Sequence, residues 1–246
     1  ARTTLVEGVA RAAGRLPPFA GPPLALTCAA IPGKLAPVVR PTTTPAFMER
    51  KVSTCLITGG AGFIGCAISQ ALVKQYDRVV VLDNLHPQVH PAQTRPDALD
   101  PAVELVVGDV ADPVVWDALL LDVKPDLVIH LAAETGTGQS LTEGTRHANV
   151  NVVGTTQMLD AFVRHHRLPS RVVLTSSRAV YGEGAWVSAE GTVSYPGQRS
   201  KTQLEAGVWD FPGLRCLPFE ATTTEPRPTS IYGATKLTQE MILNAW

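Results

Sequence analysis

The sequence lacks the features that mark several large classes of protein. Only four of its 246 residues are cysteines, and they form no CxxC pair: Cys28, Cys55, Cys66 and Cys216. This spacing argues against a disulfide framework and a cysteine metal site, so we expect no bound metal and a reducing compartment, the cytoplasm. No apolar run reaches the roughly 18–20 residues that a membrane-spanning helix needs. We therefore expect no membrane partner.

An excess of one charge is also missing. The chain has 21 Lys and Arg against 22 Asp and Glu, and it contains no basic run. Nucleic-acid binding therefore has no electrostatic support. Hydrophobic residues, in contrast, make up 45% of the chain, which is enough for a substantial core. The length fits one large α/β domain or two small ones.

The two ends of the chain differ from its middle. Proline is concentrated in residues 1–47, which show no sustained period. We predict that this stretch is a poorly ordered leader or linker and that residues 48–246 form the folded domain. The helical pattern of residues 237–246 contains no stop signal. We therefore expect the chain to be truncated.

Short apolar runs alternate with helical patterns from residue 52 onward. Five runs are typical of buried parallel strands: residues 52–58, 78–83, 103–108, 126–133 and 171–176. Helices are predicted after the first run, from Asp112-Pro113, and over residues 149–164. The alternation predicts an α/β fold, a doubly wound parallel sheet with helices on both faces. The first helix should bury a face made of Ile64, Ala67, Ile68, Ala71 and Leu72.

The stretch CLITGGAGFIG, residues 55–65, places three glycines between the first strand and the first helix. Gly59 allows a sharp turn, Gly62 lets a pyrophosphate approach the backbone, and Gly65 lets the helix pack closely on the sheet. The helix, with Phe63 and Ile64 in its first turn, directs free N–H groups and a partial positive charge at the phosphates. The spacing therefore predicts a dinucleotide site rather than only a tight turn.

Polar side chains follow the second and third strands. Asp83 ends the second strand, where its carboxylate can accept hydrogen bonds from both ribose hydroxyls and would repel a 2′-phosphate. Because Asn84 stands next to it in place of an arginine, we predict NAD rather than NADP as the cofactor. Asp109 and Val110 follow the third strand and are predicted near the adenine. The alternative for Asp109 is a cap of the local turn.

A serine-rich strand end and a later tyrosine–lysine pair supply candidate catalytic groups. Tyr232 and Lys236 are four apart, so they share one face of the last predicted helix. A lysine ammonium and the positive nicotinamide ring both favour the phenolate, which makes Tyr232 a candidate general base. Ser177 would hydrogen-bond the same substrate oxygen, and Lys236 would also hold the nicotinamide ribose.

The motifs TGGAGFIG, DLVIHLAA, SSRAVYG and YGATK occur in this order. Together they resemble the extended short-chain dehydrogenase/reductase family, and within it the NAD-dependent nucleotide-sugar epimerases and dehydratases. The resemblance implies a Rossmann-like fold, catalysis by Ser177, Tyr232 and Lys236, and a homodimer when full length. It further implies that residues 48–246 form an NAD-binding domain truncated before the C-terminal substrate-binding part. It also implies that Asn151 steadies the active-site helix near the cofactor, with a locally bonded asparagine as the alternative. Other residues on the cofactor side would be Leu131, Ala132, Ala133, Thr135, Thr175 and Ser176.

The resemblance also narrows the reaction. Dehydratases of the family carry Asp-Glu where this chain has Arg178-Ala179, so elimination of water is not expected. The stretch ETGTGQS, residues 134–140, resembles epimerases of the dTDP-L-rhamnose type, with UDP-hexose 4-epimerases as near neighbours. We therefore predict an NAD-dependent 4-epimerase whose nucleotide-sugar substrate is a dTDP-deoxysugar or a UDP-hexose. The alternatives are an NAD(P)-dependent nucleotide-sugar dehydrogenase or reductase and a dinucleotide-binding fragment without turnover.

Residues 184–228 separate Tyr232 from the serine segment, the stretch around Ser176 and Ser177, by more residues than is common in the family. We predict an insertion that forms a lid or surface excursion beside the site, with Trp209 and Asp210 as candidate substrate contacts. A solvated loop is the alternative. Relatives with such an insert can carry paired cysteines, but only Cys216 lies in this one, so we predict no zinc.

Overall fold

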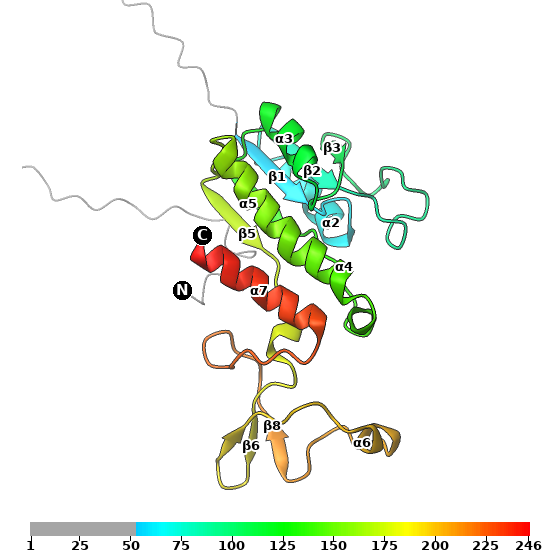
Figure 1. Ribbon diagram of the computed structural model, residues 1–246, viewed down its shortest axis with the longest axis vertical. Helices are drawn as coiled ribbons and strands as arrows, with labels where there is room; N and C mark the ends of the chain where they lie inside the picture. The colour runs from blue at the N-terminus through cyan, green and yellow to red at the C-terminus, as the bar shows by residue number, and fades with distance from the viewer. Residues whose placement is uncertain (1–52) are drawn as a thin grey trace, which may run out of the picture.

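The computed structural model describes residues 53–246 (Figure 1). The predictions made for residues 1–47 lie outside this range. A five-stranded parallel sheet has the order β3-β2-β1-β4-β5. This arrangement confirms the predicted fold class. Its strands are β1 Thr54–Thr58, β2 Arg78–Asp83, β3 Glu104–Val107, β4 Leu127–His130 and β5 Arg171–Leu174.

The strands β3, β4 and β5 end earlier than the apolar runs that predicted them. The run at residues 126–133 gives a strand only to His130. The Leu131 N–H still donates to the Thr58 carbonyl at 2.9 Å, and the chain leaves the ladder after it. Leu131 and the residues after it line a pocket at the carboxyl edge of the sheet. An apolar run thus marks the strand together with the first wall residues beyond it.

Helices flank the sheet: α2 Phe63–Leu72, α3 Pro113–Asp122, α4 Gly144–Ala148 and α5 Gly154–Arg164, with one turn of 3-10 helix, η1, at Gln139–Leu141. α3 begins as predicted, because the Asp112 carboxylate accepts a hydrogen bond from the Val114 N–H at 2.9 Å. The helix predicted over residues 149–164 is longer. It begins at α4 and continues into α5 through a π-helical turn, η2 Asn149–Val153.

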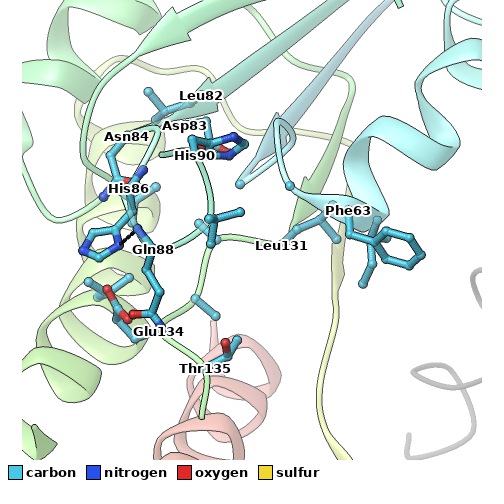
Figure 2. Close-up of a pocket in the computed structure, with 18 of the residues that line it drawn as sticks. Phe63, Leu82, Asp83, Asn84, His86, Gln88, His90, Leu131, Glu134 and Thr135 are labelled. Atoms are coloured by element: carbon cyan, nitrogen blue, oxygen red, sulfur yellow. Dashed lines mark hydrogen bonds and ion pairs between the residues drawn. The ribbon is translucent and has the colours of Figure 1, made fainter. Parts of the chain in front are cut away.

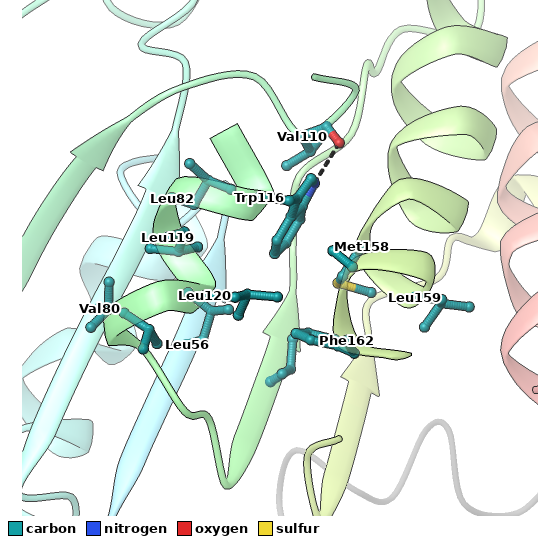
Figure 3. Packing of buried hydrophobic residues seen from close by; sticks show 13 residues of the cluster. Leu56, Val80, Leu82, Val110, Trp116, Leu119, Leu120, Met158, Leu159 and Phe162 are labelled. Atoms are coloured by element: carbon teal, nitrogen blue, oxygen red, sulfur yellow. Dashed lines mark hydrogen bonds between the residues drawn. The ribbon is translucent and has the colours of Figure 1, made fainter. Parts of the chain in front are cut away.

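Two apolar clusters lie on opposite faces of the sheet. Leu56 of β1 points to the face covered by α3 and α5, where Trp116 and Phe162 meet edge to face at 5.9 Å (Figure 3). Its neighbour Ile57 points to the other face, with Leu72 of α2. Alternate side chains of one strand therefore feed both cores, which is the expected result of a sheet covered on both sides.

The predicted apolar face of α2 is partly wrong. Ala67 and Ala71 are exposed, and Ile64 is 50% exposed. The buried residues are instead Gly65, Ser69 and Leu72. A Cβ on Gly65 would lie 2.1 Å from the Gly60 carbonyl oxygen, so the helix approaches the turn along its small residues. Small side chains allow this close approach, and a count of apolar residues misses them.

The insertion forms a small folded unit of its own. Three antiparallel strands have the order β7-β6-β8: β6 Trp186–Ser188, β7 Val193–Ser194 and β8 Leu214–Cys216. Between β7 and β8 lies the short helix α6 Lys201–Glu205, which begins with a capping box at Ser200. In Figure 1 this unit lies away from the parallel sheet, below the start of α7.

The last helix, α7 Ile231–Ala245, follows the insertion and packs against η3 Arg178–Tyr181, a 3-10 turn just after β5. A Cβ on Gly233 would lie 2.4 Å from the Ala179 carbonyl oxygen, so only glycine allows the helix to lie this close. This contact brings the serine segment and the start of the tyrosine helix together. Within residues 53–246, no helix has the length and apolar character needed to cross a membrane.

Candidate active site

The glycine turn has the conformation that its sequence predicted. Gly59 has φ +66°, and a Cβ there would lie 2.6 Å from the backbone nitrogen of Ala132. Both facts require glycine, because an L-residue at this φ is strained and the approaching atoms are backbone. A Cβ on Gly62 would meet only the Gly59 carbonyl oxygen, at 3.3 Å. The backbone at Gly62 therefore has space beside it that a ligand can enter.

Asp83 ties the turn to the end of β2. The residue is 8% exposed, and its Oδ2 accepts a hydrogen bond from the Ala61 N–H at 3.0 Å. Its Oδ1 accepts one from the Leu85 N–H at 2.9 Å, and His90 Nε2 lies 4.0 Å from the same oxygen. A carboxylate has about four lone-pair positions, so acceptor capacity is left for a ligand.

A pocket of about 390 Å³ lies along the carboxyl edge of the sheet, from Asp83 and Asn84 to Glu134 and Thr135 (Figure 2). It therefore joins the predicted ribose side to the predicted nicotinamide side. The pocket is lined by these residues predicted as cofactor contacts: Gly59, Gly62, Phe63, Ile64, Asp83, Asn84, Val110, Leu131, Ala132, Ala133 and Thr135.

Other lining residues were missed by the sequence reasoning. Several of them follow Asp83 directly, in the loop after β2, which is where the chain passes the carboxyl edge. Their position was the available signal, although the loop has no motif. They are Leu82, His86, Gln88, Val89 and His90, together with Gly108, Glu134 and Val150.

Some predicted cofactor and catalytic residues do not line this pocket: Gly65, Asp109, Asn151, Thr175, Ser176, Ser177, Tyr232 and Lys236. Asp109 accepts a hydrogen bond from the Ala111 N–H at 2.8 Å, as a turn cap does, and its Oδ2 accepts one from Asn84 Nδ2 at 3.4 Å. Thr175 Oγ1 donates to the His130 carbonyl at 3.3 Å. Gly65 packs against Gly60 instead.

Asn151 joins the pocket wall to the last helix. Its Oδ1 accepts from the Glu134 N–H at 2.8 Å, and its Nδ2 donates to the Glu134 carbonyl at 3.0 Å and to Thr235 Oγ1 at 2.9 Å. The side chain is fully buried within the π-helical turn η2. A π-turn often marks a functional position, because it reorients one side chain within a helix.

His147 connects the pocket wall to Tyr232. It is fully buried, and its two ring nitrogens lie 3.0 Å from the Glu143 carbonyl oxygen and 3.2 Å from the Thr135 carbonyl oxygen. Its ring meets the Tyr232 ring edge to face, with centroids 6.3 Å apart. Tyr232 is therefore one side chain away from Thr135, which lines the pocket. His147 precedes Asn151 by one helical turn, and that shared face was the only sequence signal for it.

Lys236 lies 2% exposed beneath the same region. Burial lowers its pKa to about 8, and the Glu240 carboxylate opposes that shift. Ser176 Oγ donates a hydrogen bond to the Glu240 carboxylate. Ser177 begins η3, and its Oγ accepts a hydrogen bond from the Ala179 N–H at 3.1 Å. The serine segment and the lysine helix are therefore linked through Glu240.

A buried polar network supports this layer from within the sheet. His130, at the end of β4, lies 2.6 Å from Thr58 Oγ1 and 3.0 Å from Thr155 Oγ1, and Gln239 of α7 donates to Thr155 at 2.8 Å. Burial lowers the pKa of His130 to about 3, and the Lys236 charge adds to this. The histidine is therefore neutral at neutral pH, and the network holds β1, β4, α5 and α7 in register.

The assembled groups can move a proton next to a negatively charged, extended ligand. A phenol, a buried amine and a serine hydroxyl lie on two elements in contact, and the glycine turn and the Asp83 carboxylate lie at the neighbouring pocket. Among residues 53–246, no group of three or more His, Cys, Asp or Glu is placed to hold a metal ion. Cys216 is exposed in β8.

The chain is similar to known proteins of one family. Residues 55–203 match the model of the NAD dependent epimerase/dehydratase family. The sequence is 64% identical over 191 residues to dTDP-L-rhamnose 4-epimerase of Burkholderia thailandensis, a match covering 78% of this chain and 53% of that protein. It is 34% identical over 128 residues to UDP-glucose 4-epimerase of Halalkalibacterium halodurans, covering 52% of this chain and 36% of that protein.

Solved structures show the same fold. The UDP-glucose 4-epimerase of Thermus thermophilus, in complex with NAD, is 26% identical, with a TM-score of 0.55, and the match covers 78% of this chain and 50% of that one. The present chain therefore spans about half the length of the relatives it matches.

Proposed function

Because the chain belongs to the NAD-dependent epimerase/dehydratase family, we propose that it carries the cofactor-binding part and the catalytic residues of a nucleotide-sugar 4-epimerase. The 64% identity to a dTDP-L-rhamnose 4-epimerase supports a dTDP-linked deoxysugar as the substrate, ahead of a UDP-hexose. The family resemblance supports a homodimer, which stays a prediction.

The residues present fit NAD. Gly59 gives the turn its sharp bend, and Gly62 leaves the backbone accessible, which suits a pyrophosphate at the start of α2. Asp83 has acceptor capacity at the pocket for the two adenosine ribose hydroxyls and would repel a 2′-phosphate. Bound NAD would supply hydride transfer at sugar C4.

The protein's own groups would handle the proton and the orientation. Tyr232 would take the proton of the C4 hydroxyl as the 4-keto sugar forms, and would return it to the epimer. Ser177 would hydrogen-bond the same oxygen. Lys236, when protonated, would hold the nicotinamide ribose and favour the phenolate of Tyr232. Because the pKa of Lys236 is lowered to about 8, this ammonium is largely retained at neutral pH.

One observation carries the proposal: His147 contacts both the pocket wall at Thr135 and the ring of Tyr232. A base that acts on a substrate beside the nicotinamide must lie next to the nicotinamide side of the pocket. The contact of Gly233 with Ala179 brings the serine segment to the same place.

The test is incubation of the full-length protein with NAD and dTDP- or UDP-sugars, with inversion at C4 followed by NMR. We expect inversion without net NADH, and we expect Tyr232→Phe to lower the rate by about 10³-fold while NAD binding is kept. Net accumulation of NADH without inversion would instead identify a dehydrogenase.

A further inference from the structure

The insertion contacts the serine segment through an aromatic side chain. Phe219, in the arm of the insertion that returns toward α7, lies over Gly184, where a Cβ would be 2.5 Å from its ring. The Phe219 ring also stacks on Tyr181 of η3, with centroids 5.6 Å apart and a 33° angle between the planes. These two contacts hold Phe219 against the segment that carries Ser177.

A second contact fixes the same segment. Gly182 has φ +60°, and a Cβ there would lie 2.1 Å from the Arg227 carbonyl oxygen. Both ends of the returning arm therefore approach η3 through positions that admit only glycine. This arm of the insertion therefore supports the serine segment through Phe219 and the Arg227 carbonyl.

Arg178 is the side chain that this support holds. It directly follows Ser177 and is exposed, and the central carbon of its guanidinium lies 5.6 Å from the centre of the Phe219 ring. Its Nη1 donates to the Gly182 carbonyl at 3.4 Å. A guanidinium has five N–H donors, so most of them are left for a ligand. Among residues 53–246, no carboxylate forms an ion pair with it.

We propose that Arg178 is a specificity-determining residue that binds the hydroxyl oxygens of the sugar part of the nucleotide-sugar. The inference rests on the proposed function, in which Ser177 bonds the C4 oxygen. The side chain of the next residue, held on Phe219, then presents its planar fork of donors to oxygens of the same sugar ring. Two neighbouring hydroxyls suit that fork, which a flexible ammonium would not match.

The charge of Arg178 also bears on the reaction. A guanidinium is always protonated and has no acceptor, so it can neither take a proton from the sugar nor act as a general acid. A segment that presents Arg178 to the sugar can therefore orient it without opening a route to elimination of water. The same residue would select the substrate and restrict the chemistry to C4.

The test compares Arg178→Gln with wild type, both as the full-length protein, by calorimetric binding of NAD, of the nucleotide-sugar and of the nucleoside diphosphate without its sugar. We expect about a tenfold loss of affinity for the nucleotide-sugar, with unchanged affinity for NAD and for the nucleoside diphosphate. In the C4 inversion assay, KM should rise by a similar factor, and kcat should change less than about threefold. The matched control is Arg227→Gln, because Arg227 makes the same kind of contact with Tyr195 at 4.6 Å and should change nothing.

A second variant separates binding from support. Phe219→Leu should weaken nucleotide-sugar binding by about threefold. Arg178→Gln added to this variant should lower the affinity by a smaller factor than it does in wild type, because the guanidinium is no longer held by the ring. An equal loss for the nucleoside diphosphate would overturn the proposal and assign Arg178 to the phosphates. Unchanged affinity, or a fall in kcat alone, would also overturn it. Wild type that binds NAD but no nucleotide-sugar would overturn the proposed function as well.

Discussion

Two glycines with the same backbone conformation show how the parallel-sheet part and the insertion differ. Gly59 in the turn after β1 and Gly207 after α6 both have φ +66°. Around Gly59 the nearest atoms are the backbone of Leu131 and Ala132, whereas a Cβ on Gly207 would meet nothing within 4 Å. The turn of the parallel-sheet part is held by close backbone approach, whereas the insertion packs through side chains such as Trp186, whose ring meets Phe211 edge to face. Close backbone approach constrains residue type far more strongly.

The largest expected effect tests this difference directly. Gly59→Ala should lower the free energy of unfolding by about 4 kcal/mol or more and abolish NAD binding, because the added methyl group meets rigid backbone. Gly207→Ala carries the same conformational strain without the collision, so it should cost about 1 kcal/mol. Thermal denaturation and NAD titration measure both. Equal losses would show that strain alone, and not packing, distinguishes the two positions.

The second effect is the acid sensitivity of the parallel-sheet part. Above pH 6.5, His130 is neutral in both the folded and the unfolded chain. Below 6.5 the unfolded chain binds a proton that the folded chain refuses until pH falls to about 3, so stability is lost over that window. Between pH 6.5 and 4 the loss should be about 3 kcal/mol. Urea denaturation at several pH values measures it.

The control for this prediction is an exposed histidine. His130→Gln should be less stable at pH 7 and should lose less stability on acidification, whereas His166→Asn should keep the wild-type pH dependence. His166 is exposed with φ +52°, a conformation that asparagine also adopts. An unchanged acid profile in His130→Gln would contradict the assignment.

The third effect concerns the stability that the fold loses by burying the charged Lys236. A fall in the pKa of Lys236 from 10.5 to about 8 corresponds, at 1.36 kcal/mol for each pH unit, to about 3 kcal/mol. This cost is present in full below pH 8 and disappears as pH rises to 10.5, because only the unfolded chain stays protonated over that range. Lys236→Met should therefore raise stability by about 2 kcal/mol at pH 7 while it removes turnover.

The measurement is denaturant unfolding of both proteins at pH 7 and pH 10. The gain in stability should shrink at the higher pH. A variant that is less stable than wild type at pH 7 would show that Lys236 stabilises the fold. Glu240 would then be the partner responsible.

The smallest effect should stay within the insertion. Arg199 pairs with Glu183 and stacks on Phe211 at 5.3 Å. Arg199→Lys keeps the charge but loses the planar stack, at a cost of about 1 kcal/mol. Amide exchange should speed up in β6 and β8 and stay unchanged in β1 and β2. As a control, Lys201→Gln removes only an exposed pair with Glu205 and should change neither. Faster exchange in β1 would mean that the two regions unfold together.

The comparison also explains which features the sequence could predict. The strands of the sheet were predictable because burial requires apolar side chains. The turn at Gly59 was predictable because its positive φ requires glycine. Ala67 and Ala71 were wrongly predicted to be buried. The small residues Gly65 and Ser69 are buried instead, and a pattern of apolar residues does not detect them. His147 was missed because its role comes from joining the Thr135 carbonyl oxygen to the ring of Tyr232, which lies far along the chain. The strands of the insertion are too short and too exposed to leave an alternating pattern.

Asn151 has a consequence for how the protein is made. Its partner Thr235 lies 84 residues further along the chain. A nascent chain that has emerged only as far as β5 can pair all five parallel strands. The Asn151 amide still lacks its acceptor on Thr235, and α7 does not yet cover η2. Contacts of such long sequence separation form late. The wall at Glu134 should therefore reach its final rigidity only after the insertion has left the ribosome.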